Sequence, residues 1–455
     1  MKRKFKIKLS VWQILSLGYL AVILLGTALL LLPFATKTGE RTNFINALFT
    51  SASATCVTGL VVYDTNTHWS LFGQIVLLFL IQLGGLGFMT LVTLLFRIFR
   101  KNKGINASKI FMATAGESRR SELGRLLKRI LFGTLLLEGL GAGLLSIRFI
   151  QDFGPVKGIY YAIWHSVSAF CNAGFDLMGG TLGQGQFVSF THYATDPIVS
   201  LPLAGLIVVG GLGFCVWDDI TKQKFRLKKT CLHTKTVLVM TVSLLTLSTL
   251  LFLFFERGNQ DYKSYNFGER ILVAFFSAVT PRTAGFNTVD LSALSDSSYL
   301  LTVLLMFVGG SSASTAGGIK ITTLFVVVMG MMSVFRGKQD IEIGKRRVHN
   351  SLLRQALAIT TACIFILITA TLLLCTFERD NQIATLQAVL FETTSALGTV
   401  GVSLSLTPTL CVASKIVLIL LMYTGRAGIL TVGLAFAQKQ TEARVRKPVD
   451  TLLIG

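Results

Sequence analysis

Charged side chains are scarce in this sequence. They make up 14% of its 455 residues, whereas apolar residues make up 52%. A soluble domain needs about 25% charged residues to cover its surface. Four apolar stretches are long enough to cross a hydrocarbon core, which takes roughly 20 residues; they are 12–32, 131–150, 236–255 and 356–377. The sequence therefore predicts an integral membrane protein and excludes one soluble core.

Motifs of common enzymatic activities are also missing. There is no G-x-x-x-x-G-K-[ST] loop for ATP hydrolysis, and no G-x-G-x-x-G, so nucleotide sensing would have to come from another chain. H-E-x-x-H, G-x-S-x-G and paired intramembrane carboxylates are absent, which makes an intramembrane enzyme a poor hypothesis. The seven cysteines form no C-x-x-C pair and indicate neither a zinc site nor a disulfide framework. We expect a protein that is not an enzyme and binds no cofactor of its own.

The net charge of +21 could suggest a nucleic-acid partner. Most of the basic residues, however, fall on alternate sides of successive apolar blocks, in 1–10, 97–129, 222–235, 336–354 and after 438. This is the pattern of cytoplasmic loops, whereas a nucleic-acid module would interleave its charges with aromatic residues. The first apolar stretch, residues 12–32, is longer than the apolar region of a signal peptide, which has about 7–15 residues, and no clean cleavage site follows it. We therefore interpret it as a membrane span. We expect a multi-pass cell-membrane protein with both termini cytoplasmic and no nucleic-acid partner.

Internal repetition organises the chain. Four short motifs begin with Ser-Ala, at Ser53, Ser168, Ser277 and Ser395, and each leads to a glycine. These glycines recur about every 115 residues; they are Gly59, Gly174, Gly285 and Gly401. A semi-apolar run too short to span precedes each, at 44–53, 160–170, 271–278 and 386–395. A full apolar segment lies before each run and another after each glycine.

A second glycine marker keeps the same period. Gly84-Gly85-Leu86-Gly87 recurs as Gly210-Gly211-Leu212-Gly213, and more weakly at Gly309-Gly310 and Gly425-Arg426. For the glycines at 84–87 and 210–213 we favour close helix approach over a pore-lining role. The unit is a span, a short re-entrant helix, a glycine loop and a span. We predict an all-α membrane fold of eight transmembrane helices around a central pore with pseudo-fourfold symmetry, with repeats 1–100, 101–220, 221–336 and 337–455, the last including a cytoplasmic C-terminal tail.

Irregular backbone cannot face lipid, so the glycine loops must line a water-filled cavity or be buried in protein. Rings of backbone carbonyls replace the hydration shell of potassium, and glycine permits the backbone angles required. The short helices would also point their partially negative C-terminal ends at the cavity. The alternative, glycines that only pack helices together, explains the fourfold spacing less well. We predict a potassium selectivity filter formed by Val57, Thr58, Gly59, Asn172, Ala173, Gly174, Thr283, Ala284, Gly285, Thr399, Val400 and Gly401.

The third repeat departs from the pattern. Residues 299–334 are largely apolar and would extend about 54 Å as one helix, well beyond a core of about 30 Å. We infer two helical pieces joined by a flexible loop beneath the filter, with one long kinked helix as the alternative. The loop consists of Gly309, Gly310, Ser311, Ser312, Ala313, Ser314, Thr315, Ala316, Gly317 and Gly318.

Five ionisable residues in or beside the apolar segments need separate interpretations. Arg426 aligns with glycines of the other repeats, and we hypothesise that it faces the inner pore, repels a cation and helps hold the loop closed. Lys320 either takes part in gating or snorkels to the cytosolic interface. Arg282 positions the outer mouth or pairs with an outer acid. His165 is interpreted as interfacial, and Glu138 as a buried partner of a polar neighbour.

These motifs resemble the Trk/Ktr/HKT superfamily of potassium transporters, most closely its Ktr-type membrane subunit, over approximately residues 11–436. The resemblance depends on Thr-Cys-Val-Thr-Gly-Leu (55–60), Asn-Ala-Gly-Phe (172–175), Thr-Pro-Arg-Thr-Ala-Gly-Phe-Asn (280–287), Gly-Thr-Val-Gly (398–401) and Ala-Ser-Thr-Ala-Gly-Gly-Ile-Lys (313–320).

The resemblance implies potassium uptake, often sodium-stimulated, by a homodimer with one pore per subunit. It also implies a cytosolic ring of regulatory subunits that bind nucleotide, and it makes 309–318 an intramembrane gating loop. Some plant relatives have a serine in place of the first filter glycine and favour sodium, so Gly59 argues for potassium. The alternative is a secondary transporter with sodium as its main substrate, which should show two discontinuous helices in opposed orientation. A structural scaffold would not need irregular backbone at this depth.

Overall fold

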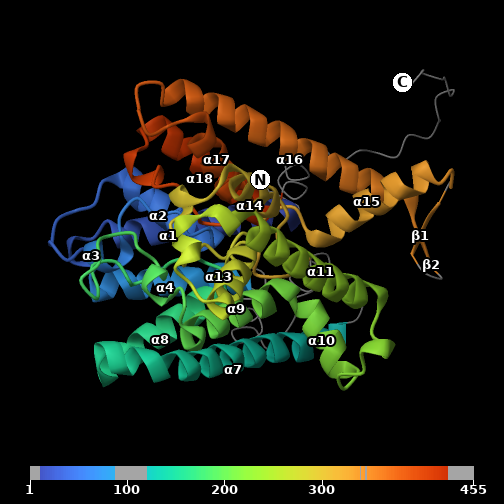
Figure 1. The fold of residues 1–455 in the computed structure, drawn as a ribbon, viewed down its shortest axis with the longest axis horizontal. Coiled ribbons are helices and arrows are strands. Elements are labelled where there is room, and N and C mark those ends of the chain that lie inside the picture. Colours follow the sequence, from blue (N-terminus) through green and yellow to red (C-terminus); the bar gives the residue numbers. More distant parts are fainter. Residues whose placement is uncertain (1–10, 88–119, 339, 344–345, 429–455) are drawn as a thin grey trace, which may run out of the picture.

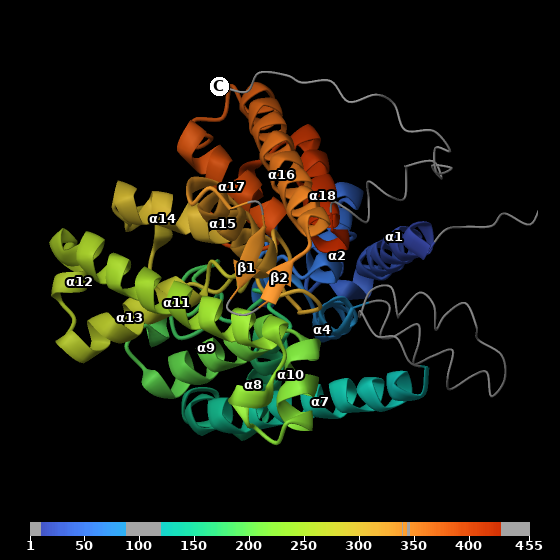
Figure 2. The same cartoon turned by 90° about the vertical axis from the view of Figure 1, so that its right-hand side faces the viewer.

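The computed structural model describes residues 11–87, 120–338, 340–343 and 346–428, and helices dominate it. In Figure 2, successive parts of the chain follow one another around the middle of the molecule. The group α1, α2 and α4 is followed by α7 to α10, then by α11 to α14, and finally by α16 to α18. The chain order is therefore also an order around a centre.

The helices that open each part are the longest. They are α1 Val11–Leu30, α7 Arg120–Phe153, α11 Leu232–Phe255 and α16 Asn350–Phe377 (Figure 1). By length and composition, three described helices can cross a membrane, namely α7, α11 and α16. The number rises to four if α9 Pro197–Leu212 and α10 Phe214–Lys222, bent by 88° at their junction, count as one span. The eight spans therefore stay a prediction.

The long helices turn large apolar side chains outward. Phe132 of α7 is 70% exposed, Phe254 of α11 63% and Phe365 of α16 73%. A soluble monomer rarely exposes extended apolar surfaces of this kind. These faces suit contact with lipid.

The predicted short helices are present. They are α2 Phe44–Cys56, α8 Pro155–Phe170, α13 Phe267–Val279 and α17 Leu386–Gly398. Polar caps start three of them: Asn43 accepts from the Ile45 N–H, Thr385 accepts from the Ala388 N–H, and Asn266 forms a capping box. The fourth, α8, begins with a proline, which suits a first helical position. All four end in the buried interior.

The returning helices are α4 Leu71–Leu86, α9, α14 Asp296–Phe307 with α15 Ile321–Phe335, and α18 Val412–Ala427. In the third part the return is broken, and a non-helical segment joins α14 to α15. The Gly309 N–H donates to the Ile319 carbonyl at 2.9 Å, which closes the base of this segment. The predicted pair of helical pieces is confirmed, and the alternative of one long helix is wrong.

Two short strands correct the expectation of an all-α chain. Strand β1 Ile341–Ile343 pairs with β2 Arg346–Val348 in an antiparallel hairpin, with Ile341 opposite Val348 (Figure 2). In β1 the β-branched residues Ile341 and Ile343 flank the charged Glu342, an alternation that favours a half-exposed strand. The remaining short elements are η1 Pro33–Ala35, α3 Thr65–His68, η2 Thr191–Tyr193, η3 Leu227–Lys229, η4 Glu256–Gly258, α12 Gln260–Lys263, η5 Leu291–Ala293 and η6 Thr407–Thr409.

The second glycine marker allows the returning helices to touch the ends of the short helices. A Cβ atom on Gly84 would collide with the Thr55 carbonyl oxygen. The same holds for Gly210 against the Phe170 carbonyl and for Gly425 against the Leu397 carbonyl; these pairs repeat one contact. This packing agrees with close helix approach as the role of these glycines.

Two glycines of α9 test this contact. Gly210→Ala should destabilise the protein by about 1–3 kcal/mol, because the added methyl group overpacks the contact with the Phe170 carbonyl. The matched control is Gly205→Ala, where a Cβ meets nothing within 4 Å. Alanine there should raise stability by up to about 1 kcal/mol through helix propensity. Thermal unfolding of the purified protein in detergent measures both, and equal shifts in the two variants would contradict the packing argument.

Candidate functional site: four glycine loops above a buried loop

The loops that follow α2, α8, α13 and α17 share one backbone conformation. Two residues before each glycine, a non-glycine residue adopts a left-handed φ: Val57 57°, Asn172 57°, Thr283 63° and Thr399 51°. The glycines have φ values of 95° (Gly59), 69° (Gly174), 77° (Gly285) and 93° (Gly401). Left-handed angles are unusual for non-glycine residues, above all β-branched ones. Repetition of this costly conformation in four loops indicates a functional demand.

Hydroxyl groups hold each loop against its own helix. The Gly59 and Gly401 N–H groups donate to the Oγ atoms of Ser53 at 3.1 Å and Ser395 at 3.0 Å. In the other two loops, the hydroxyl donates to the carbonyl after the glycine, from Ser168 Oγ at 2.7 Å in the second and from Thr280 in the third. Each loop is thus tied to the helix that precedes it.

The four glycines meet at one centre, and we call them the glycine ring. A Cβ atom on any one of them would press on main-chain atoms of a neighbouring loop. The added Cβ of Gly59 would lie 2.6 Å from Ala173 O, and that of Gly174 would lie 2.7 Å from Gly285 Cα. The added Cβ of Gly285 would lie 2.8 Å from Val400 O, and that of Gly401 would lie 2.9 Å from Gly59 Cα. The structure therefore brings the predicted site residues of all four loops together.

A cavity of about 150 Å³ lies against the glycine ring, and all four glycines line it. Three carboxylates, Asp64, Asp176 and Asp290, are also on its wall. Acids gathered around a partly enclosed space attract cations and raise their local concentration. We call this space the acidic cavity.

Asp64 and Asp176 have different surroundings in the acidic cavity. Asp64 accepts from the Thr67 N–H at 2.8 Å and from the Phe187 N–H at 3.0 Å. Burial disfavours the charged form of Asp176 and raises its pKa to about 7, and the negative charge of Asp64 acts in the same direction. The charge of the acidic cavity therefore depends on pH near neutrality.

Another carboxylate fixes the chain that follows Gly401. Glu392 lies in α17 and is fully buried. It accepts hydrogen bonds from the hydroxyls of Ser403, at 2.7 Å, and Thr407. A buried acid with two donors is a structural anchor, and this one ties the fourth loop to its helix.

Three buried threonine hydroxyls near the loops, those of Thr55, Thr58 and Thr399, have no hydrogen-bond partner within the described residues. Buried polar atoms are almost always paired with protein or water. The Thr399 hydroxyl faces Gly317, where a Cβ atom would collide with it. These three hydroxyls are available to a polar guest.

The segment between α14 and α15, residues 308–320, lies on the other side of the ring, and we call it the lower loop. The Ser311 N–H donates to the Gly211 carbonyl at 3.0 Å, and the Phe214 N–H donates to the Ala313 carbonyl at 2.9 Å. These bonds seat the loop on the junction of α9 and α10. Gly317 of the lower loop lies against the Thr399 side chain, so the loop also packs against the fourth glycine loop.

Two cations contact the lower loop in different ways. The Arg426 guanidinium donates to the carbonyls of Thr315 and Gly84, so it joins the loop to α4. The Lys320 ammonium donates to the Ala316 carbonyl at 2.7 Å and to the Gly317 carbonyl at 3.4 Å. Lys320 therefore turns back onto the lower loop.

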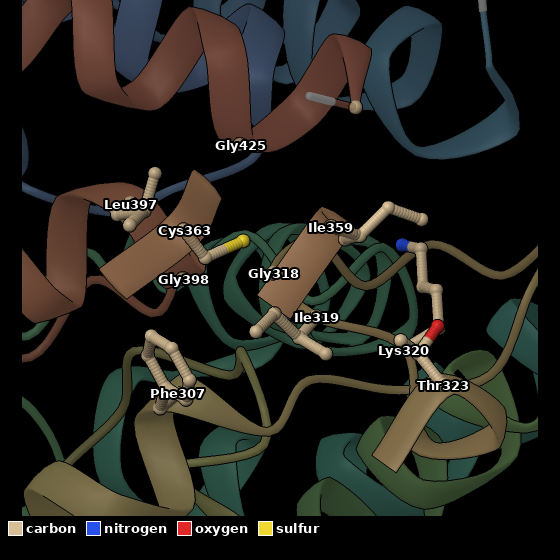
Figure 3. A pocket seen from close by; sticks show the side chains of 11 residues that line it. Phe307, Gly318, Ile319, Lys320, Thr323, Ile359, Cys363, Leu397, Gly398 and Gly425 are labelled. Carbon is tan, nitrogen blue, oxygen red and sulfur yellow. The ribbon is translucent and has the colours of Figure 1, made fainter. Parts of the chain in front are cut away.

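A second cavity, of about 100 Å³, lies beside the end of the lower loop. Figure 3 shows Ile319 and Lys320 on one side of it, with Phe307 of α14 and Cys363 of α16 facing the same space. The lining is mostly apolar. The lower loop is thus bordered by open space on one side and anchored by hydrogen bonds on another.

Two sequence interpretations need correction, and a third is confirmed. Arg282 is 5% exposed and pairs with no acid in the described part of the chain; its side chain reaches only the Thr241 hydroxyl, at 3.4 Å. His165 is not interfacial but fully buried. Both ring nitrogens have partners inside the protein: the Leu177 N–H donates to Nε2 at 3.0 Å, and Nδ1 bonds the Tyr161 carbonyl at 2.7 Å. Glu138 is buried beside Gln82, at 3.4 Å, as predicted.

Sequence reasoning missed Asp64, Asp176 and Glu392. The two aspartates follow the first and second glycines within a few residues, which is a weak signal for a polar mouth. Glu392 gives a clearer one, because it is the only charged residue in α17. A lone acid in a short apolar helix calls for a buried partner.

Comparison with known proteins agrees with the site. A family model described as TrkH, cation transport protein, matches residues 12–446. The potassium/sodium uptake protein NtpJ of Enterococcus hirae is 38% identical over 100% of this chain and 99% of that protein. Ktr system potassium uptake protein B of Bacillus subtilis is 36% identical over 97% and 96%. The crystal structure of the potassium transporter TrkH from Vibrio parahaemolyticus shares the fold, with a TM-score of 0.73 and 18% identity over 96% of this chain and 87% of that one.

Proposed function

This chain belongs to the TrkH family of cation transport proteins, and we propose that it takes up potassium through a pore at the centre of its glycine ring. It is a transporter and not an enzyme. Relatives of similar length are named for the uptake of potassium, one of them for potassium and sodium. The proposal assigns potassium as the main cargo.

The convergence of the four loops carries this proposal. Main-chain atoms of each loop lie within contact distance of the next glycine position, so no side chain intervenes at the centre. Carbonyl oxygens arranged in this way can replace several waters of an alkali ion at once without adding full charges. We assign the selectivity filter to Val57, Thr58, Gly59, Asn172, Ala173, Gly174, Thr283, Ala284, Gly285, Thr399, Val400 and Gly401.

In this mechanism the ion enters from the acidic cavity. The aspartates concentrate cations there, and the C-terminal ends of the four short helices favour positive charge at the ring. The ion exchanges water for carbonyl oxygens in the filter. Release on the inner side requires the lower loop to move away.

We propose that the lower loop is the gate. It contains residues 309–318, and Lys320 and Arg426 belong to the same device. Support comes from its seat beneath the ring and from Arg426, which joins it to α4. Arg426 also places a fixed positive charge where a departing cation must pass.

The architecture and partners follow from the same proposal. We propose eight spans in four repeats, 1–100, 101–220, 221–336 and 337–455, around a pseudo-fourfold axis, with both termini in the cytoplasm of a cell-membrane protein. The order of helix groups around the centre supports this arrangement. We also propose a homodimer, a cytosolic ring of nucleotide-binding regulatory subunits and stimulation by sodium. Relatives named as parts of a Ktr system support dependence on further components.

The second candidate is a secondary transporter that carries mainly sodium. The name of the Enterococcus hirae relative favours it, since sodium is named beside potassium. Four equivalent loops at one centre favour the pore, because an inverted-repeat carrier is built around two discontinuous helices. Gly59 favours potassium over sodium.

Gly285→Ser tests the filter. A side chain at this position would press on Gly174 Cα at 2.6 Å and Val400 O at 2.8 Å, and φ is 77°. Rubidium uptake in cells deficient in potassium uptake should fall about tenfold or more, with a reduced preference for potassium over sodium. The control Gly268→Ser, in α13 where a Cβ meets nothing within 4 Å, should keep wild-type values. Wild-type uptake and preference in Gly285→Ser would count against the filter assignment.

Arg426→Ala tests the gate. Loss of the charged hydrogen bonds to Thr315 and Gly84 should loosen the loop and raise resting cation leak about tenfold. Flux from proteoliposomes without a regulatory partner measures this leak. Lys415→Ala is the matched control, because Lys415 is on the same helix but bonds Asn46. Unchanged leak together with unchanged uptake in Arg426→Ala would refute the role.

Asp176→Asn tests the acidic cavity. With a pKa of about 7, Asp176 is charged above neutrality and neutral below it, so wild-type uptake at low potassium should fall as external pH drops through 7. The variant should take up potassium more slowly at pH 8 and lack this pH step. The control Asp296→Asn, at the start of α14 and outside the cavity, should keep the wild-type pH profile. An unaltered pH profile in Asp176→Asn would contradict the assignment.

A further inference from the structure

The Asn172 side chain joins two of the glycine loops. This residue is fully buried and adopts a left-handed φ of 57°. Nδ2 donates to the Arg282 carbonyl at 3.2 Å and lies 3.4 Å from the Thr283 hydroxyl. The second loop therefore holds the main chain of the third loop where that chain enters the glycine ring.

The other end of the same amide contacts the lower loop. The Thr315 hydroxyl donates to Asn172 Oδ1 at 3.2 Å, and Thr315 is 1% exposed. The Thr315 carbonyl accepts from Arg426, and its N–H donates to the Gly210 carbonyl at 3.4 Å. A single buried amide thus bridges the third glycine loop and the centre of the lower loop.

Gly210 leaves room for this bridge. A Cβ atom there would lie 2.9 Å from Asn172 Oδ1 and 3.1 Å from the Thr315 hydroxyl oxygen. The equivalent residues of the other loops are Val57, Thr283 and Thr399. Valine has no hydrogen-bonding group, and the Thr399 hydroxyl has no partner in the described chain. Among the described hydrogen bonds, only Asn172 connects a glycine-loop side chain to the lower loop.

We propose that Asn172 is a positioning residue through which the lower loop sets the potassium affinity of the filter. The inference deepens the proposed function and rests on it. While the loop is seated, the Thr315 hydroxyl fixes the amide, and the amide fixes the third filter loop in its ion-binding geometry. When the loop leaves, Oδ1 loses this donor and the amide is free to turn. Affinity is then lower in the open state, which helps the ion to leave, since conduction requires binding that is not too tight.

Linkage makes the proposal measurable in the resting protein. If the seated loop raises potassium affinity, bound potassium must stabilise the seated loop by the same factor. Thermal unfolding of the purified full chain, without a regulatory partner, should therefore give a potassium-dependent rise in Tm. Titration with potassium and with sodium gives an apparent Kd for each ion.

Thr315→Val is the central variant. It removes the hydroxyl, keeps the shape of the side chain and leaves both main-chain bonds of Thr315 in place. The apparent Kd for potassium should rise about three- to tenfold, the scale of one buried hydrogen bond, and resting rubidium leak should increase. Thr315→Ser keeps the donor and should restore a Kd near the wild-type value. The matched control is Thr302→Val, a buried threonine of α14 that bonds only the Ser298 carbonyl, at 2.7 Å.

Asn172→Gly provides the second arm. Glycine tolerates the left-handed backbone angle and removes the whole amide. Its Kd should rise at least as far as that of Thr315→Val, and the double variant should show no further increase, because both changes break one path.

The outcomes separate the possible failures. If Thr315→Val increases leak while its potassium Kd stays at the wild-type value, the loop only plugs the pore and the coupling is refuted. Additive effects of the two changes would also refute it. If Gly285→Ser retains the wild-type potassium-dependent rise in Tm, the filter assignment itself fails, whatever Thr315→Val does.

Discussion

At the centre of this molecule, the main chains of the four glycine loops pack so closely that a Cβ atom on any of the four glycines would not fit. That requirement explains why four helices stop inside the protein: a helix extended by another turn would bring side chains to the centre. It also explains the second set of glycines, which lets the returning helices touch the carbonyls that end the short helices. Lipid offers no hydrogen bonds, so these exposed carbonyls must face one another, water or an ion.

The four glycine loops are alike in backbone conformation, but the four parts differ in side chains and in the third returning helix. In the first and fourth glycine loops, the N–H of the glycine donates to a serine hydroxyl. In the second and third loops, a hydroxyl donates to the carbonyl of the residue after the glycine. The third returning helix is broken to make the lower loop. The fourth has Arg426 where the others have glycine. A ring of equal loops can select an ion, and the proposed gate is formed where the third and fourth repeats differ from the others.

Features with a local pattern could be predicted from the sequence, and features made by distant contacts could not. Two glycine motifs that recur with the same period located the short helices to within a few residues. The apolar stretch 299–334 is longer than one membrane span, which indicated the broken helix. The β1–β2 hairpin was missed because three-residue strands are too short to show a period. Burial of His165 depends on partners at Tyr161 and Leu177 that a single apolar run does not reveal. The bond from Thr315 to Asn172 spans 143 positions and has no local signal.

The two cations near the lower loop should behave differently when the proposed gate opens. Lys320 bonds carbonyls of its own loop, so these bonds can move with the loop. Arg426 belongs to α18 and bonds both the loop and α4, so opening must break one of its contacts and leave its charge beside the path. The acids Asp64, Asp176 and Asp290 lie on one side of the ring and the two cations on the other, so in the proposed orientation the field draws a cation in but resists its exit. Opening therefore has to remove the steric block of the lower loop and move the Lys320 charge at the same time. Because Lys320 belongs to that loop, one displacement of the loop does both.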